Sequence, residues 1–219
     1  MIGHLARPSP FLAPRVFLML DGLLIFVDVD TQRDFLEPGA SLFVGGSEAI
    51  RPNLARLTTF ARANRIPIIA TACAHEAADR EDGFPPHCIR GTPGQERVEE
   101  TADPGTMVIE PGSGAVPQFP ALHMTIHKRA YDVFSTPEAE QVFAVFAPHE
   151  PTFVVYGVAT DYCVRCAVDG LIDRGYPVAV VTDAVRGVDP ERAEAELARF
   201  ASRGALLTTT DAVCANNPS

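Results

Sequence analysis

The sequence predicts an α/β fold, a three-layer α/β/α sandwich around a mostly parallel central sheet with Rossmann-like topology. Short, nearly continuous apolar runs of strand length alternate with segments in which apolar residues recur at helical spacing. The chain has 219 residues, enough for one large domain with a substantial core. We therefore predict a single domain over residues 19–219 and place residues 1–18 outside it, as a flexible N-terminal extension.

The first predicted unit is strand, helix, strand. Residues 23–29 form an apolar run typical of a strand that is buried on both faces. A helix is expected from Ser47, an N-cap residue, because apolar residues follow at helical spacing at Ile50, Leu54, Leu57 and Ala61. Residues 66–71 are the second strand, and a parallel crossover is the usual form of such a unit.

The remaining elements continue the alternation. Residues 73–105 are rich in glycine, proline and charge, and a loop of this length inside a compact domain usually carries function. Helices are expected at 138–146, 161–174 and 190–202. Further strands are expected at 107–110, 124–128, 152–156, 177–182 and 205–208.

Composition excludes several classes of function. The net charge of −10 disfavours binding to nucleic acid or to an anionic membrane. Five cysteines are too few and odd in number for a disulfide scaffold, so a reducing cytoplasm is expected. Asp21 and three early prolines argue against a signal peptide. Neither a P-loop nor a G-x-G-x-x-G motif occurs, so no organic cofactor is predicted.

Three reactive side chains fall at the carboxyl ends of predicted strands, where open parallel sheets bind ligands: Asp30, Lys128 and Cys163. Cys163 is expected in the first turn of a helix, where the helix dipole favours a thiolate. Asp30 could accept the thiol proton while Lys128 stabilises the charged pair. Each residue also has an ordinary alternative: a core cysteine, a turn-forming aspartate and a solvated lysine.

Cys163 and Cys166 form a C-x-x-C motif, which by itself suggests a thiol redox protein. Redox folds place this motif early in a small domain, whereas here it follows at least four predicted strands. A thiol redox protein is therefore the alternative from another class of function.

Three segments resemble, in order and spacing, the isochorismatase-like cysteine hydrolases: Asp-Thr-Gln-Arg-Asp-Phe at 30–35, His-Lys-Arg-Ala-Tyr-Asp-Val-Phe at 127–134 and Gly-Val-Ala-Thr-Asp-Tyr-Cys-Val at 157–164. Phe-Pro-Pro-His-Cys at 84–88, with Arg-Gly-Thr-Pro-Gly at 90–94, is similar to the nicotinamidase and pyrazinamidase branch.

The resemblance implies an amidohydrolase that cleaves nicotinamide or a related small carboxamide through a thioester, in a homo-oligomer. It implies a catalytic triad of Asp30, Lys128 and Cys163, and a cis peptide before Ala159 that sets the Ala159 and Cys163 amides as an oxyanion hole. Phe35 and Phe84 match pocket positions, the latter usually tryptophan in the branch. A different small amide or a carbamoyl compound is the alternative substrate.

The resemblance also raises the question of a metal. Nicotinamidases bind a divalent metal through an Asp-x-His pair and a later histidine; here the pair reads Cys73-Ala74-His75, and His87 keeps the later position. Thiolate and imidazole ligands would favour zinc over magnesium or manganese. Asp79 or Glu81 could replace a further ligand used by some relatives. An empty site, with Cys73 an inert thiol, is the alternative.

Overall fold

The computed structural model describes residues 22–79, 83–118 and 122–215, so the predicted extension at 1–18 and Glu81 lie outside the described residues. Its centre is a seven-stranded sheet in the order β3-β4-β2-β1-β5-β6-β7, and every ladder between neighbouring strands is parallel. The strands are β1 Leu24–Val29, β2 Ile68–Cys73, β3 Met107–Ile109, β4 His123–Lys128, β5 Thr152–Val158, β6 Val178–Arg186 and β7 Leu206–Thr208.

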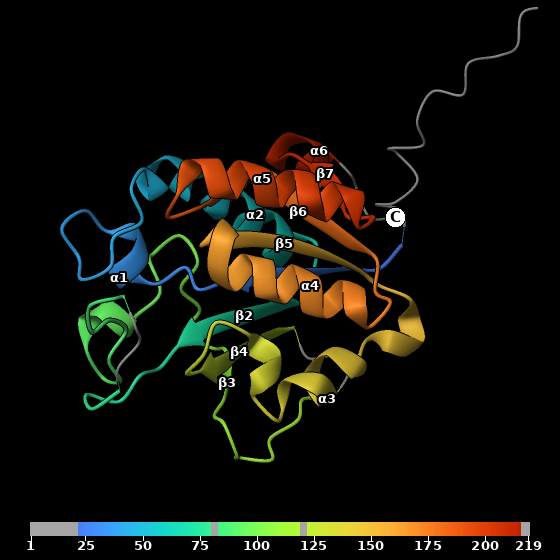
Figure 1. Ribbon diagram of the computed structural model, residues 1–219. Helices are drawn as coiled ribbons and strands as arrows, with labels where there is room; N and C mark the ends of the chain where they lie inside the picture. Colours follow the sequence, from blue (N-terminus) through green and yellow to red (C-terminus); the bar gives the residue numbers. More distant parts are fainter. Residues whose placement is uncertain (1–21, 80–82, 119–121, 216–219) are drawn as a thin grey trace, which may run out of the picture.

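Helices cover both faces of this sheet, which confirms the predicted three-layer α/β/α fold (Figure 1). α4 (Arg165–Asp173) and α5 (Pro190–Ser202) lie in front of the sheet in Figure 1, with α3 (Ala139–Ala144) below them. The opposite face is covered by α2 (Arg51–Ala63) and α6 (Thr210–Ala215), which contact each other. α1 (Arg33–Leu36) lies at the carboxyl ends of the strands.

The apolar runs become strands because both of their faces are covered. All residues of β1, β2 and β5 are buried, as a central parallel strand requires. α5 begins and ends where the sequence predicts, and Asp189 caps it by accepting hydrogen bonds from the Glu191 and Arg192 amides.

Several predicted boundaries are wrong. β2 runs on to Cys73 and β6 to Arg186, because backbone pairing with β4 and β5 continues beyond the apolar stretches. The helix expected at 161–174 begins with a π-helical turn, Thr160–Val164, before α4. The helix expected at 138–146 is shorter, since α3 is followed by the 3₁₀ turn Ala147–His149. α1 and α6 were not predicted.

The order of the strands places one switch point at the middle of the sheet. From β1 the chain forms β2 beside it, then the edge strand β3, and then β4 between β2 and β3; it next crosses to form β5 on the other side of β1. Ligand sites of doubly wound sheets lie at the carboxyl ends of the two strands that flank such a point. In the described ranges no helix is long and apolar enough to cross a membrane.

Candidate active site

The structure brings Asp30, Lys128 and Cys163 together at the switch point. Asp30 follows β1, Lys128 ends β4, and Cys163 lies in the π-helical turn after β5. The Lys128 Nζ lies 2.7 Å from Asp30 Oδ2 and donates to the Cys163 Sγ at 3.4 Å. All three residues are buried. Lys128 therefore links the carboxylate and the thiol in a site that excludes most water.

Asp30 is held by β2. The Thr71 hydroxyl donates to Asp30 Oδ1 at 2.5 Å, and the Asp30 amide donates to the Thr71 carbonyl at 3.1 Å. Burial and the nearby Cys73 raise the pKa of Asp30 to about 6, although Lys128 and the Thr71 hydrogen bond act in the other direction. The carboxylate is thus ionised at neutral pH but basic enough to take up a proton.

Lys128 is charged in spite of its burial. Desolvation acts to lower its pKa, but the Asp30 carboxylate and the sulfurs of Cys163 and Cys73 outweigh it, so the pKa is raised well above its ordinary value. Its ammonium also donates to the Ala130 carbonyl at 3.0 Å and to the Cys73 Sγ at 3.3 Å. Lys128 thus has several acceptors, as a buried cation requires.

Cys73 lies beside the triad, a contact that the sequence did not predict. Its Sγ contacts Asp30 Oδ2 at 3.6 Å and Lys128 Nζ, and the ligand atoms of Asp30, Cys73 and Cys163 all lie within 4.8 Å of one another. A hydrogen bond from Cys163, together with Lys128, holds the pKa of Cys73 well below its ordinary value. The same hydrogen bond and burial raise the pKa of Cys163.

The predicted effect of the helix start is one of several that act on the Cys163 thiol. Its place in the first turn of the helix is as expected, and there the hydrogen bond to Cys73 and burial raise the pKa of its thiol.

Backbone geometry around Cys163 is fixed by the end of β5. The Val158–Ala159 peptide is cis, as the resemblance implies. The Ala159 carbonyl accepts from the amides of Tyr162 and Val164, so the turn closes around Cys163. Ala159 and Cys163 both line the pocket described next.

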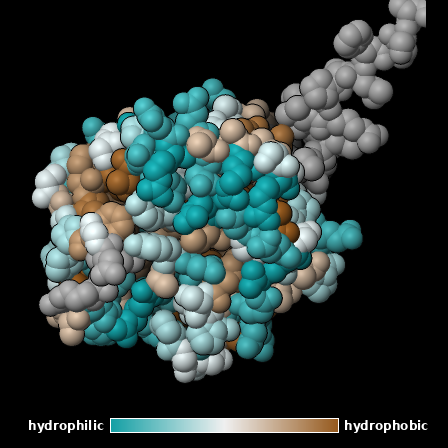
Figure 2. Space-filling model, in the orientation of Figure 1, coloured by the Kyte–Doolittle hydropathy of each residue, from teal (hydrophilic) through white to brown (hydrophobic). Residues whose placement is uncertain are grey.

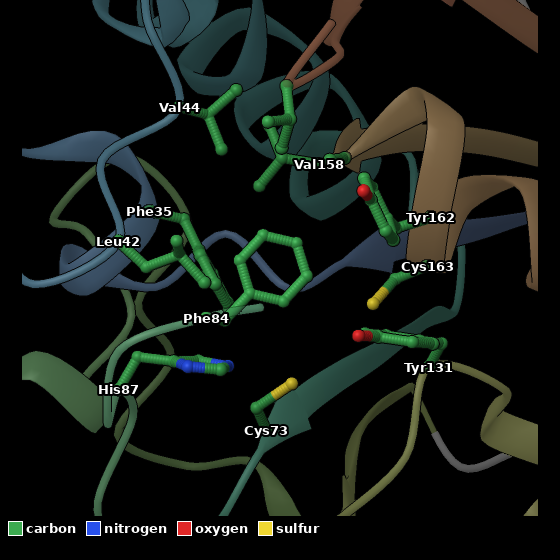
Figure 3. Close-up of a pocket in the computed structure, with 12 residues that line it drawn as sticks. Phe35, Leu42, Val44, Cys73, Phe84, His87, Tyr131, Val158, Tyr162 and Cys163 are labelled. Atoms are coloured by element: carbon green, nitrogen blue, oxygen red, sulfur yellow. The ribbon is translucent and has the colours of Figure 1, made fainter. Parts of the chain in front are cut away.

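A pocket opens over the thiol (Figure 3). Phe35 and Phe84 line it as predicted, and the Phe84 ring meets the Tyr162 ring edge-on at 5.3 Å. His87 also lines it, together with apolar or aromatic residues that the sequence did not assign to the pocket: Leu42, Val44, Tyr131, Val158, Tyr162 and Val188. Tyr131 and Tyr162 lie inside the motifs quoted above, and this position was the one indication in the sequence that they belong to the site.

Hydrophobic side chains also gather at the surface on this edge of the molecule, beside the α1 region (Figure 2). Val188, at the pocket, is 42% exposed. Asp161 holds the segment that carries it, since its carboxylate accepts from the amides of Val188 at 3.0 Å and Asp189 at 3.1 Å. The aspartate of the third motif thus positions a wall of the pocket.

The three predicted metal ligands lie together. The ligand atoms of Cys73, His75 and His87 are within 4.8 Å of one another, and all three residues are buried. His75 Nε2 is a buried atom without a hydrogen-bond partner, and His87 Nδ1 lies 2.9 Å from the Pro85 carbonyl.

One sulfur and two imidazole nitrogens suit zinc, so the residues present fit a divalent metal. Asp79 is not in this cluster; its carboxylate pairs with Arg129 and lies 3.8 Å from His75 Nδ1, where it can orient the ring.

The two cysteines of the C-x-x-C motif have different surroundings. Cys163 contacts Lys128 and the β2 thiol, while burial raises the pKa of Cys166. All five cysteines are free.

The family model of the isochorismatase domain matches residues 23–212, so the chain belongs to the isochorismatase family, a family of hydrolases. A probable inactive nicotinamidase of Arabidopsis thaliana is 28% identical over 174 residues, which are 74% of this chain and 80% of that protein.

Among solved structures, the pyrazinamidase of Pyrococcus horikoshii in complex with zinc is 28% identical, covers 85% of this chain and 98% of its own, and has a TM-score of 0.66. An isochorismatase family protein of Desulfovibrio vulgaris is 25% identical, covers 88% and 97%, and has a TM-score of 0.70. These findings confirm the resemblance to the nicotinamidase-like branch.

Proposed function

We propose that this protein is a cysteine amidohydrolase that cleaves the C–N bond of a small carboxamide, nicotinamide or a related amide, through a thioester on Cys163. The observation that carries the proposal is the Lys128 ammonium, which contacts both the Asp30 carboxylate at 2.7 Å and the Cys163 thiol at 3.4 Å. This is a nucleophile with a base and a fixed positive charge beside it.

In the first half of the reaction, the Cys163 proton passes to Asp30 and the sulfur attacks the amide carbon. Lys128 stabilises the thiolate as it forms, which offsets the raised pKa of this buried thiol. The amides of Ala159 and Cys163 would donate to the oxyanion. Asp30 then gives its proton to the departing nitrogen, and ammonia leaves.

In the second half, Asp30 takes a proton from water, and the hydroxide attacks the thioester carbon. The C–S bond breaks, the carboxylic acid is released, and the proton returns to the Cys163 sulfur. Asp30 accepts and returns one proton in each half, for which a pKa of about 6 is well suited.

The pocket supports an uncharged substrate. Among the described residues that line it, the wall is apolar or aromatic apart from the thiols and the His87 imidazole, and it holds no carboxylate or ammonium. A charged group on the substrate would therefore lose its hydration without an oppositely charged partner there. The Phe84, Tyr131 and Tyr162 rings lie edge-on or tilted to one another, an arrangement that suits a flat ring or a compact apolar group.

A metal held by Cys73, His75 and His87 would supply a Lewis acid that anchors a lone pair of the substrate beside the reacting amide. Cys73 also touches Lys128, so the metal and the triad would share this sulfur. The zinc-bound pyrazinamidase supports a metal of this kind.

The test is ammonia release from a panel of carboxamides, with nicotinamide and pyrazinamide first and carbamoyl compounds as the second arm. Cys163→Ala should abolish release of ammonia from every substrate that the wild type accepts. Cys166→Ala, on the next turn, is the matched control and should keep the activity. Ammonia release by Cys163→Ala at the wild-type rate would overturn the proposal.

A further inference from the structure

Cys73 and Cys163 come from β2 and from the turn after β5, 90 positions apart in the sequence, and meet at one ammonium. Lys128 Nζ lies 3.3 Å from one sulfur and 3.4 Å from the other, and the two sulfurs are within 4.8 Å of each other. Figure 3 shows the two thiol groups pointing toward one another across the base of the pocket.

We propose that Cys73 and Cys163 are a modification site, a dithiol that a hydroperoxide converts to a disulfide, which reversibly blocks the nucleophile. Blocking the nucleophile rests on the proposed hydrolase function, whereas formation of the disulfide rests on the thiol geometry alone. This pairing differs from the C-x-x-C motif, because the partner of Cys163 is the thiol across the sheet rather than Cys166.

The hydroperoxide is the oxidant that accepts the two electrons released when the disulfide forms. One thiol attacks the outer oxygen of the hydroperoxide, which is reduced to water or an alcohol, and the sulfur becomes a sulfenic acid. The second sulfur attacks the sulfenic sulfur, an S–S bond forms, and the S–O bond breaks with release of water. Reduction by an added dithiol returns both thiols.

Three features of the site favour this reaction. Both sulfurs border the pocket, so a small peroxide can reach them. The Lys128 ammonium stabilises negative charge on whichever sulfur attacks. A disulfide needs the sulfurs at about 2.05 Å, and the two sulfurs already lie within 4.8 Å of each other.

The same sulfur cannot serve a metal and a disulfide at once. Cys73 is also the sulfur of the candidate metal cluster. Zinc bound there should protect the dithiol from peroxide, and oxidation should prevent zinc from binding.

The sequence allows a clean assignment of the disulfide. Arg165 separates Cys163 from Cys166, so trypsin places them in different peptides, 130–165 and 166–174. Cys73 lies in peptide 66–80 and Cys88 in peptide 81–90. Each possible partner of Cys163 therefore gives a different cross-linked mass.

The experiment treats reduced, metal-free full-length protein with hydrogen peroxide, blocks the remaining thiols and maps the peptides without reduction. The expected product joins 66–80 to 130–165 and disappears after dithiothreitol, and hydrolase activity falls and returns with it. Cys166→Ala should form the same product. Cys73→Ser should instead accumulate sulfinic acid on Cys163, which dithiothreitol does not reverse.

A link from 130–165 to 166–174, or sulfinic acid on wild-type Cys163 without any link, would overturn the proposal. The peptide map does not need a known substrate, so it tests formation of the disulfide even if the hydrolase proposal is wrong. Thermal unfolding of Cys73→Ser checks that the variant is folded. If Cys73→Ser is not folded, the peptide map of Cys166→Ala assigns the disulfide partner of Cys163.

Discussion

The side-chain amide of Gln32 pairs with both backbone groups of Cys73. Its Oε1 accepts from the Cys73 amide at 2.7 Å, and its Nε2 donates to the Cys73 carbonyl at 2.8 Å. The Nε2 also donates to the Gln95 carbonyl at 2.7 Å, and Gln32 is fully buried. One side chain thus fixes the end of β2, where the second thiol lies, to the loop that follows it.

Gln32→Glu should destabilise the protein by about 3 kcal/mol, because an oxygen replaces the donor that faces two carbonyl groups. Urea unfolding measures the change. Asn53→Asp makes the same chemical change at an exposed amide that donates to the Asp183 carbonyl, and it should cost under about 0.5 kcal/mol. Equal effects at the two positions would contradict the role of Gln32.

The activity should depend on pH through Asp30. Its pKa of about 6 means that the carboxylate loses its charge below that pH, so kcat/KM should rise as the pH increases through about 6. Thr71→Val removes a hydrogen bond that lowers this pKa, so the acidic limb should move to higher pH. Thr71→Ser keeps the hydroxyl and should leave the limb in place. A limb that is the same in all three proteins would exclude Asp30 as its origin.

Metal binding should require the buried imidazoles. Protein loaded with zinc and then passed through a desalting column should keep about one equivalent, and His75→Ala or His87→Ala should lose most of it. His149→Ala, at an exposed position, is the control and should bind like the wild type. Elemental analysis gives the answer; less than about a tenth of an equivalent in the wild type would rule the site out.

Phe84→Ala should raise KM about tenfold with a smaller effect on kcat, since it removes a ring that packs on Tyr162 and costs ~1.4 kcal/mol of binding. Steady-state kinetics on the best amide of the panel measures both constants. Met107→Ala, an exposed residue on the edge strand β3, should change neither. A fall in kcat alone would mean that Phe84 acts on the chemical step.

Gly157→Ala should prevent correct folding. A Cβ at this residue of β5 would lie 2.1 Å from the Val29 carbonyl oxygen, and the φ of +114° disfavours any side chain. Gly175→Ala also has a positive φ, but its Cβ would meet no atom within 4 Å, so it should cost only about 1 kcal/mol. Soluble yield and thermal unfolding compare the two; a stable, soluble Gly157→Ala would show that the strands can move apart there.

The sequence predicts the strands well because central parallel strands are buried on both faces, and β1 and β5 are therefore apolar almost throughout. It does not predict α6, whose six residues bury only Thr210 and Val213 and carry too little pattern. The end of β2 was also missed, because Ala72 and Cys73 are not typical strand residues and are placed there by pairing with β4.

The members of the site were predictable from their positions at strand ends, but the electrostatics were not. Helix position alone favours a thiolate on Cys163. The hydrogen bond to Cys73, which raises the pKa of Cys163, is not predictable in this way, because only the pairing of strands brings the two thiols together. The hydrogen bonds of Gln32 are also not predictable from the motif, because their partner Cys73 lies beside Gln32 only once β2 is in place in the sheet.

Asp30, Lys128 and Cys163 lie where strands end, whereas Leu42, Phe84, Tyr131 and Val188 lie on separate connecting segments. The reacting groups are held by the sheet, and the surfaces that choose the substrate are not. Under the proposed function, one amide substrate can therefore be exchanged for another by altering one segment at a time, without changing the reacting groups. Relatives that share the triad should diverge in substrate first at these four positions.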